Sequence, residues 1–225
     1  MKLYTYCLRY DDGAAPNPYW GMCSLAICKP VIRRTAGIGD WIVGFGSTTS
    51  PIGYISNCVV YAMKVTKVLS MSDYDKFCQE HLPGKIPDLK SSDFRLRVGD
   101  CIYDFADSDS PQLRPGVHDE RNKETDLGGK NVLLSDRFYY FGDKPTKLKQ
   151  ELHSIIHKNQ GHKSHANDPY ADDFKSWLEV FGFHPNILYG EPQLKKTIEA
   201  SEDCRGICSI QDRKDDEVDE ICSSA

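Results

Sequence analysis

The chain has 225 residues, a net charge of −5 and 40% hydrophobic residues. This length and hydrophobic content are enough for one packed domain that needs no disulfide or metal to be stable. No stretch approaches the ~20 consecutive apolar residues that a membrane-spanning helix needs. The first residues also lack the apolar core of a secretory signal. We therefore expect a cytoplasmic protein with no membrane partner.

Acidic residues concentrate at the C-terminal end of the chain. Residues 199–225 contain nine acidic and three basic residues, so the rest of the chain is close to neutral. A polar, acidic segment with few aromatic residues is typical of disorder. We predict one domain over residues 1–192 and an acidic, disordered tail over 193–225, which could recruit a protein partner.

The nine cysteines do not predict a disulfide framework, because their number is odd and no secretory signal precedes them. The spacings Cys23–Cys28 and Cys204–Cys208 are imperfect metal spacings without a second matching pair. We expect mostly small buried thiols, and we predict no metal and no cofactor.

Strand-forming residues alternate with turn signals through the first two thirds of the chain. Strands are predicted at 3–10, 21–28, 40–45, 57–65, 99–103, 132–134 and 138–141. Helices are predicted at 71–81, with Ser72 as N-cap, at about 145–158 and at about 172–181. The long irregular region 84–131 is expected to lie over a site. This order lacks regular βαβ alternation and predicts an α+β fold, with a mixed, curved or barrel-like sheet flanked by helices.

Four groups of motifs carry a family resemblance. The first group covers residues 10–18 and 28–34, and the second covers residues 39–47 and 61–65. The third covers residues 99–103, 132–135 and 138–142, and the fourth covers residues 161–164, Trp177 and residues 190–192. Their order and spacing resemble the nucleotide-modification-associated domain family (Nmad2-like) of bacteria and their viruses, over about residues 1–192. The resemblance implies a link to nucleic-acid modification. Two residues depart from the pattern, Ala14 and Cys101.

The segment 39–44, leading into the strand at 57–65 and then a helix, is also similar to PUA-like and EVE-like domains. That resemblance implies a barrel with a nucleobase pocket beside it, and it operates at the level of the fold alone.

Three cations lie within six residues, at Lys29, Arg33 and Arg34. The lysine charge and the forked arginine donors suit phosphate groups, and Lys163 in a later turn joins them as a candidate. The alternative is a solvated strand edge.

A base pocket is predicted from polar and aromatic residues of the shared motifs, because Asn17 and Asp40 can pair with base edges and an indole can stack on a base. The candidates are Asn17, Asp40, Trp41, Ser47, Tyr103 and His162. Three of these have a structural alternative: Asp40 can accept turn N–H bonds, Trp41 can pack in the core, and the glycines before Ser47 can form a bulge.

Catalysis is a second possibility, because a histidine can exchange protons near neutral pH. His118 and His162 are candidate acid/base groups, with Asp40 or Asp100 as carboxylate partner. No familiar nucleophile, nucleotide-loop or deaminase motif is recognisable. The leading hypothesis is therefore binding of a nucleotide or of a modified base in DNA or RNA, within a base-modification or defence system. The alternatives are an enzyme of base modification and a protein-interaction module.

Overall fold

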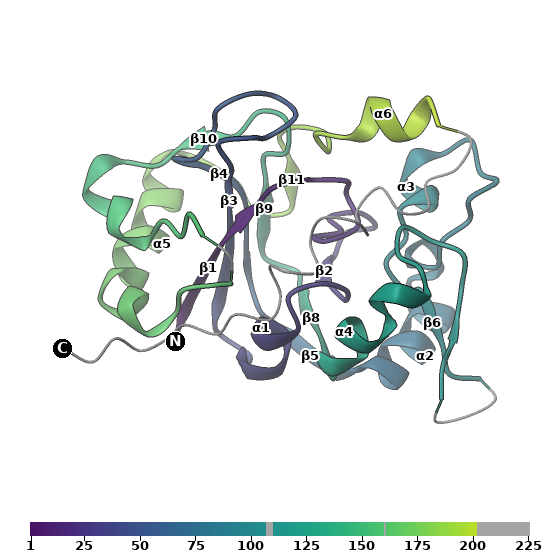
Figure 1. The fold of residues 1–225 in the computed structure, drawn as a ribbon. Coiled ribbons are helices and arrows are strands. Elements are labelled where there is room, and N and C mark those ends of the chain that lie inside the picture. The colour runs from purple at the N-terminus through teal and green to yellow at the C-terminus, as the bar shows by residue number, and fades with distance from the viewer. Residues whose placement is uncertain (107–109, 160, 202–225) are drawn as a thin grey trace.

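The structure is a computed structural model that describes residues 1–106, 110–159 and 161–201. It is a mixed α+β fold in which a larger and a smaller sheet pack together and helices cover the outside (Figure 1). The α+β class predicted from the sequence is confirmed.

The larger sheet is mixed. Its strands are β1 (Leu3–Leu8), β3 (Trp41–Gly46), β4 (Cys58–Lys64), β9 (Phe138–Tyr140), β10 (Thr146–Lys147) and β11 (Ile187–Leu188). The order is β1-β3-β4-β9-β11, and β10 pairs with β4. The pairs β1/β3 and β9/β11 are parallel, whereas β4 runs antiparallel to both β3 and β9.

The smaller sheet consists of β2 (Cys23–Leu25), β8 (Asn131–Ser135) and β5 (Lys67–Ser70), all antiparallel, in the order β2-β8-β5. A separate hairpin pairs β6 (Tyr103–Asp104) with β7 (Gln112–Leu113). The described strands form open paths and no closed barrel, so the curved or barrel-like, PUA-like part of the expectation is not confirmed.

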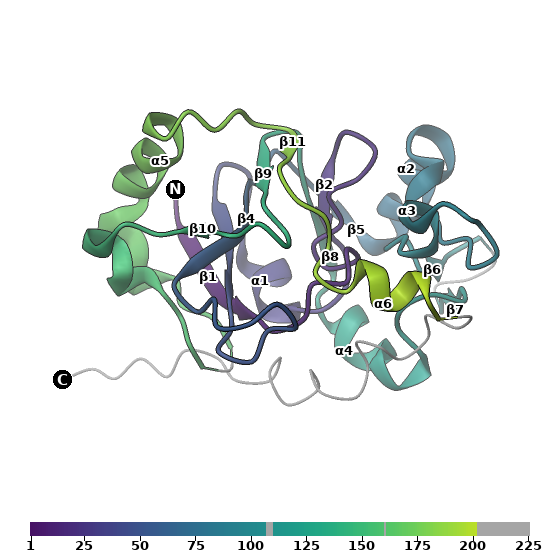
Figure 2. The same ribbon diagram turned by 90° about the horizontal axis from the view of Figure 1, so that it is seen from above.

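Two hydrophobic clusters lie on opposite faces of the larger sheet, because successive side chains of a strand point to opposite sides. Trp41, Val43 and Phe45 face a cluster that also contains Phe174 and Trp177. Ile42, on the other face, joins the larger cluster that includes the smaller sheet. Figure 2 shows α5 (Ala171–Val180) on one side of β1 and β4, and the smaller sheet with α2 (Met71–His81) on the other.

The remaining helices are short and surround the smaller sheet or the C-terminal end. They are α1 (Pro30–Thr35), α3 (Phe94–Arg97), α4 (Lys123–Gly128) and α6 (Lys195–Glu199), with 3₁₀ turns at Pro83–Lys85, Glu120–Asn122, Gln150–Ile155 and His165–Tyr170. Among the residues the structure describes, no helix is long and apolar enough to cross a membrane.

Most predicted elements are present, with three local corrections. Of the strand expected at 99–103, only Tyr103 is in a strand, β6. The helix expected at about 145–158 is instead strand β10 followed by the 3₁₀ turn Gln150–Ile155, although Leu148 and Leu152 are buried as its pattern predicted. The N-cap of α2 is Ser70 rather than Ser72, because the Ser70 hydroxyl accepts from the N–H of Asp73 at 3.0 Å.

The packed chain continues past residue 192, where we expected the domain to end. Leu194 and Ile198 are buried in the larger cluster, and the N–H of Leu194 donates to the carbonyl of Asp11 at 2.9 Å. Residues 193–201 therefore belong to the packed fold. The rest of the expected tail, residues 202–225, lies outside the described residues.

Candidate active site

A sharp turn after strand β2 presents Cys28. Both Cys28 (φ 57°) and the next residue, Lys29 (φ 42°), are in the left-handed region, and Pro30 then begins α1. Left-handed conformations cost a residue with a side chain roughly 1–2 kcal/mol each. Two in succession, neither of them glycine, mark a turn whose geometry is maintained at a cost, as occurs where a reactive side chain is positioned.

Cys28, His118 and Asp126 form a buried thiol–imidazole–carboxylate line. Cys28 Sγ lies 3.4 Å from His118 Nε2, and His118 Nδ1 lies 2.6 Å from Asp126 Oδ2. The N–H of Cys28 also donates to Asp126 Oδ1 at 2.8 Å, so the carboxylate fixes both the imidazole and the backbone of the thiol. The relative exposure of Cys28 is 6% and that of His118 is 4%.

Long-range packing brings these three side chains together. Cys28 follows β2, His118 lies in the region between β7 and the turn Glu120–Asn122, and Asp126 is on α4. The hydroxyl of Tyr103, in β6, donates to Asp126 Oδ2 at 2.9 Å. The long region 84–131 thus supplies the imidazole, the carboxylate and the tyrosine of the cluster.

The imidazole and the carboxylate act as an ion pair. Burial by itself lowers the pKa of His118, but the charges of Asp126 and Cys28 and the hydrogen bonds to both together outweigh burial and hold the pKa well above its usual range. Burial by itself raises the pKa of Asp126, but the charge and hydrogen bond of His118 hold it below the ordinary value. Such a buried pair is costly to desolvate, so its presence is weak evidence for a stabilising role alone.

The guanidinium of Arg33 holds the backbone around the cysteine–histidine–aspartate cluster. It is fully buried; its Nε donates to the carbonyl of Cys28 at 2.7 Å, its Nη1 to the carbonyl of Asn131 at 3.0 Å, and its Nη2 to the carbonyl of Asp126. Arg33 was predicted to bind phosphate, but it has no exposed surface here and its donors hold backbone carbonyls. We therefore assign it to the framework of the site.

The other predicted phosphate ligands lie at or near the surface. Lys29 Nζ is 5.1 Å from the centre of the Tyr6 ring, and Arg34, which is exposed, donates to the carbonyl of Gly128 at 2.9 Å. Lys163, half-buried, donates to the carbonyl of Ser154. Residues 30–35 form α1 rather than a strand edge, and this helix turns Arg33 inwards and Arg34 outwards.

Asn17 and Asp100, predicted for the base pocket and for catalysis, belong to a second buried network. Lys85 Nζ donates to Asn17 Oδ1, to the carbonyl of Asn17 and to Ser24 Oγ, each at 2.8 Å. Asp100 accepts from Ser24 Oγ at 2.5 Å and from the hydroxyl of Tyr74 at 2.7 Å. All five side chains are at most 2% exposed, so this network joins β2 to α2 inside the core.

The remaining candidates are in structural surroundings. Asp40 accepts from the N–H groups of Lys2 and Gly37 at 2.7 and 3.0 Å, and Trp41 is 1% exposed and stacks on Tyr139. The hydroxyl of Ser47, after a register shift between Gly44 and Phe45, accepts from the N–H of Thr49 at 3.1 Å. His162 is buried beside the Tyr4 ring, with 5.8 Å between ring centres.

Of the predicted site residues, the structure brings His118 and Tyr103 together at Asp126. Sequence reasoning missed Cys28 as a nucleophile and Asp126 as its carboxylate. The one local signal was Cys28 directly before Lys29-Pro30, since a proline at the first helical position marks a helix start. No local pattern connects that turn to Asp126, whose sequence separation from Cys28 is 98 residues.

The fold and the cluster define a mixed α+β protein with a buried cysteine–histidine–aspartate arrangement next to a strained turn. The chain belongs to the family described as nucleotide modification associated domain 2, whose model matches residues 1–199. This confirms the family resemblance and links the chain, at the level of the family description, to nucleotide modification. No curated protein and no solved structure matches the chain.

Proposed function

We propose that this protein is a cysteine-dependent enzyme of nucleotide modification in which Cys28 is the nucleophile, His118 the proton carrier and Asp126 the group that orients the imidazole. The observation that carries the proposal is the alignment of Cys28 Sγ, His118 and Asp126 at 3.4 and 2.6 Å. A nucleophile beside a base that a third group orients is the general arrangement of covalent catalysis.

The electrostatics support a reactive thiol. His118 is kept protonated by Asp126, and an imidazolium next to a thiol favours the thiolate, which is the nucleophilic form of cysteine. The strained backbone at Cys28 and Lys29 supports the same role, because a structural thiol could occupy an ordinary turn.

Acyl transfer is the reaction class that this arrangement fits best. The Cys28 thiolate attacks the carbonyl carbon of an amide or ester, and a carbon–sulfur bond forms. As the carbon–nitrogen or carbon–oxygen bond breaks, His118 gives its proton to the departing atom. Water then attacks the thioester carbon and gives a proton to His118, the carbon–sulfur bond breaks, the carboxylic acid leaves and the thiolate is regenerated. The substrate is an acylated or amide-bearing nucleotide, or such a base in nucleic acid. Nucleotide binding, the function favoured by the sequence, thereby becomes the recognition part of a catalytic role.

Alkylation of the thiols tests the proposal directly. Intact protein is treated with iodoacetamide at a series of pH values, and the labelled peptides are quantified by mass spectrometry. Cys28 should react faster below about pH 7 than Cys7 and Cys58, although both of these thiols are less buried. Asp126→Asn, which keeps the size of the side chain, should slow the labelling of Cys28 about tenfold or more and leave that of Cys58 unchanged. A Cys28 that reacts more slowly than both references at every pH, with no response to Asp126→Asn, would refute a catalytic thiol.

The link to nucleotides needs a second measurement. Nucleoside and nucleotide pools are compared by mass spectrometry in cells that express the wild type, Cys28→Ser or the matched control Cys58→Ser. The wild type and the control should alter the same species, and Cys28→Ser should alter none. Identical pools in all three strains would contradict a role in nucleotide chemistry.

A further inference from the structure

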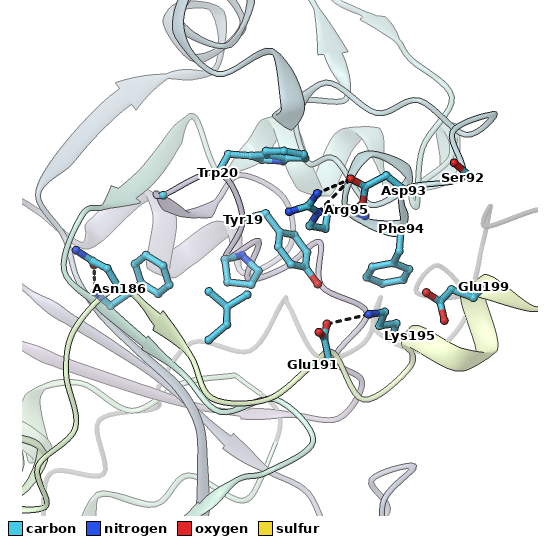
Figure 3. Close-up of a pocket in the computed structure, with 14 residues that line it drawn as sticks. Tyr19, Trp20, Ser92, Asp93, Phe94, Arg95, Asn186, Glu191, Lys195 and Glu199 are labelled. Atoms are coloured by element: carbon cyan, nitrogen blue, oxygen red, sulfur yellow. Dashed lines mark hydrogen bonds and ion pairs between the residues drawn. The ribbon is translucent and has the colours of Figure 1, made fainter.

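A cavity of about 540 Å³ opens at the opposite end of the β2/β8 strand pair from Cys28. It lies between the tip of the hairpin 18–21, the start of α3, the strands β9 and β11, and the segment that leads into α6 (Figure 3). Its volume is within the range of small-molecule sites.

The cavity is distant from the cysteine cluster along the sheet. Cys23 pairs with Ser135 and Leu25 with Leu133, so the hairpin tip before Cys23 and Phe138 after Ser135 lie at one end of the β2/β8 pair. Cys28 follows Leu25 at the other end, where Arg33 holds the carbonyl of Asn131. In Figure 1, α1 and α4 accordingly lie at the lower edge of the molecule and α6 at the upper edge.

A buried hydroxyl of the cavity wall has no partner. Tyr19 is 4% exposed, and its hydroxyl makes no hydrogen bond among the described residues. Figure 3 shows it pointing towards the space between Phe94, Glu191 and Lys195. Burial raises the pKa of Tyr19, so the hydroxyl stays protonated and can donate. A buried donor without an acceptor costs free energy, which a ligand with an acceptor at this position would recover.

The walls suit a flat ring. Tyr19, Trp20, Phe94 and Phe138 line the cavity, and the guanidinium of Arg95 lies 4.8 Å from the centre of the Trp20 ring. Asp93 keeps that guanidinium in place through contacts of 3.0 Å to Nε and 2.6 Å to Nη2. Aromatic rings and a planar guanidinium are the groups that stack on heterocycles.

The charges of the cavity disfavour an anion. Its two cations each have a carboxylate partner, Arg95 with Asp93 and Lys195 with Glu191 at 3.2 Å. A third carboxylate, Glu199, also lines the cavity, so acidic groups outnumber basic ones. A phosphate would meet net negative charge here.

We propose that this cavity is a second ligand site, separate from Cys28, that binds a nucleobase as the free base or the unphosphorylated nucleoside, with the Tyr19 hydroxyl donating to an acceptor on the ring. The choice of a nucleobase among flat rings rests on the same family link to nucleotide modification as the proposed function. The cavity itself is independent of the cysteine cluster.

Calorimetric titration of the full chain with adenosine, guanosine, cytidine and thymidine, and with their monophosphates, tests the site. At least one nucleoside should bind with a saturable titration curve. Its monophosphate should bind at least about threefold more weakly, and the difference between the two dissociation constants should become smaller as salt is added. Tyr19→Phe should weaken nucleoside binding about fivefold, while Tyr54→Phe, an exposed tyrosine outside the cavity, should have no effect. Tyr19→Phe should fold normally because the lost hydroxyl has no partner.

Cys28→Ser separates this proposal from the proposed function, since it should keep nucleoside binding unchanged. The proposal is overturned if no nucleoside binds at about 10 mM, if the monophosphate binds more tightly than its nucleoside, or if Tyr19→Phe binds as the wild type does. Binding of an oligonucleotide without binding of any nucleoside would overturn it too.

Discussion

Asp11 is a carboxylate buried next to the C-terminal segment of the fold. It is 0% exposed, and the hydroxyl of Tyr140 lies 2.7 Å from each of its oxygens. Burial raises the pKa of Asp11 to about 7, against the opposing effect of the Tyr140 hydrogen bond. Below its unfolded pKa of 3.8 the group is neutral in both states, and its contribution to stability is fully present. That contribution is lost as the pH rises towards about 7, because the unfolded chain releases the proton that the folded protein retains.

Asp11→Asn should therefore make stability less dependent on pH. A shift of this size corresponds to about 4 kcal/mol at most between pH 4 and pH 8, so the melting temperature of Asp11→Asn relative to the wild type should rise across that interval. Asp136→Asn, at an exposed aspartate, is the matched control and should show a constant difference. A constant difference for Asp11→Asn as well would mean that folding does not shift the pKa of Asp11.

The turn between β2 and α1 places the proposed nucleophile, Cys28, in a backbone conformation that lowers the stability of the fold. Cys28 and Lys29 both have positive φ, and Asp126 and Arg33 hold the backbone of Cys28 through its N–H and its carbonyl. Glycine would adopt this conformation without steric cost. The sequence instead has a thiol and a lysine there, which fits a turn that places a reactive group.

Lys29→Gly tests whether this strain is coupled to reactivity. Lys130, exposed two residues after α4 with φ 59°, is the matched control, because it is also a lysine with positive φ. Both Lys29→Gly and Lys130→Gly should raise the free energy of unfolding, by up to about 1 kcal/mol, in chemical denaturation. Only Lys29→Gly should slow the alkylation of Cys28, and equal labelling rates in the two variants would show that the turn does not tune the thiol.

At the scale of the whole molecule, residues 193–201 pack against the larger hydrophobic cluster and complete the core. Ile198 is 0% exposed in the larger cluster, Gln193 contacts Ser50, and α6 packs near α3. The family match ends at residue 199, close to the end of this packed segment. The functional unit therefore includes α6, which also lines the proposed nucleobase cavity.

Two truncations separate the contribution of the packed segment from that of residues 202–225. A chain that ends after Ser201 should melt at the temperature of the full chain. A chain that ends after Pro192 loses the buried side chains of Leu194 and Ile198 and should lose about 3 kcal/mol or more of stability. Differential scanning calorimetry measures both, and equal melting temperatures for the two truncations would contradict the packing of α6.

Local patterns in the sequence determined much of the framework. The alternation and turn signals located β1, β3, β4, β8 and β9, and the helical spacing after Ser70 located α2. The same spacing was misleading at 145–158. There Thr146 pairs with Val59 of β4, and the apolar residues are buried by a 3₁₀ turn instead of an α-helix. The apolar residues are buried as their spacing predicted, but the pairing with β4 decided the backbone conformation.

The candidate sites depended on the tertiary structure. The sequence identified His118 by its chemistry, yet the thiol that it faces is 90 residues away. The only local signal at that thiol is the helix start at Pro30, and Asp126 has none. The sign of a charge does not tell which way its side chain points: Arg33 and Arg34 are neighbours in sequence, but α1 buries one and exposes the other. Local chemistry fixes which groups are available, whereas the packing of distant segments fixes which of them meet, because only packing removes the water between them.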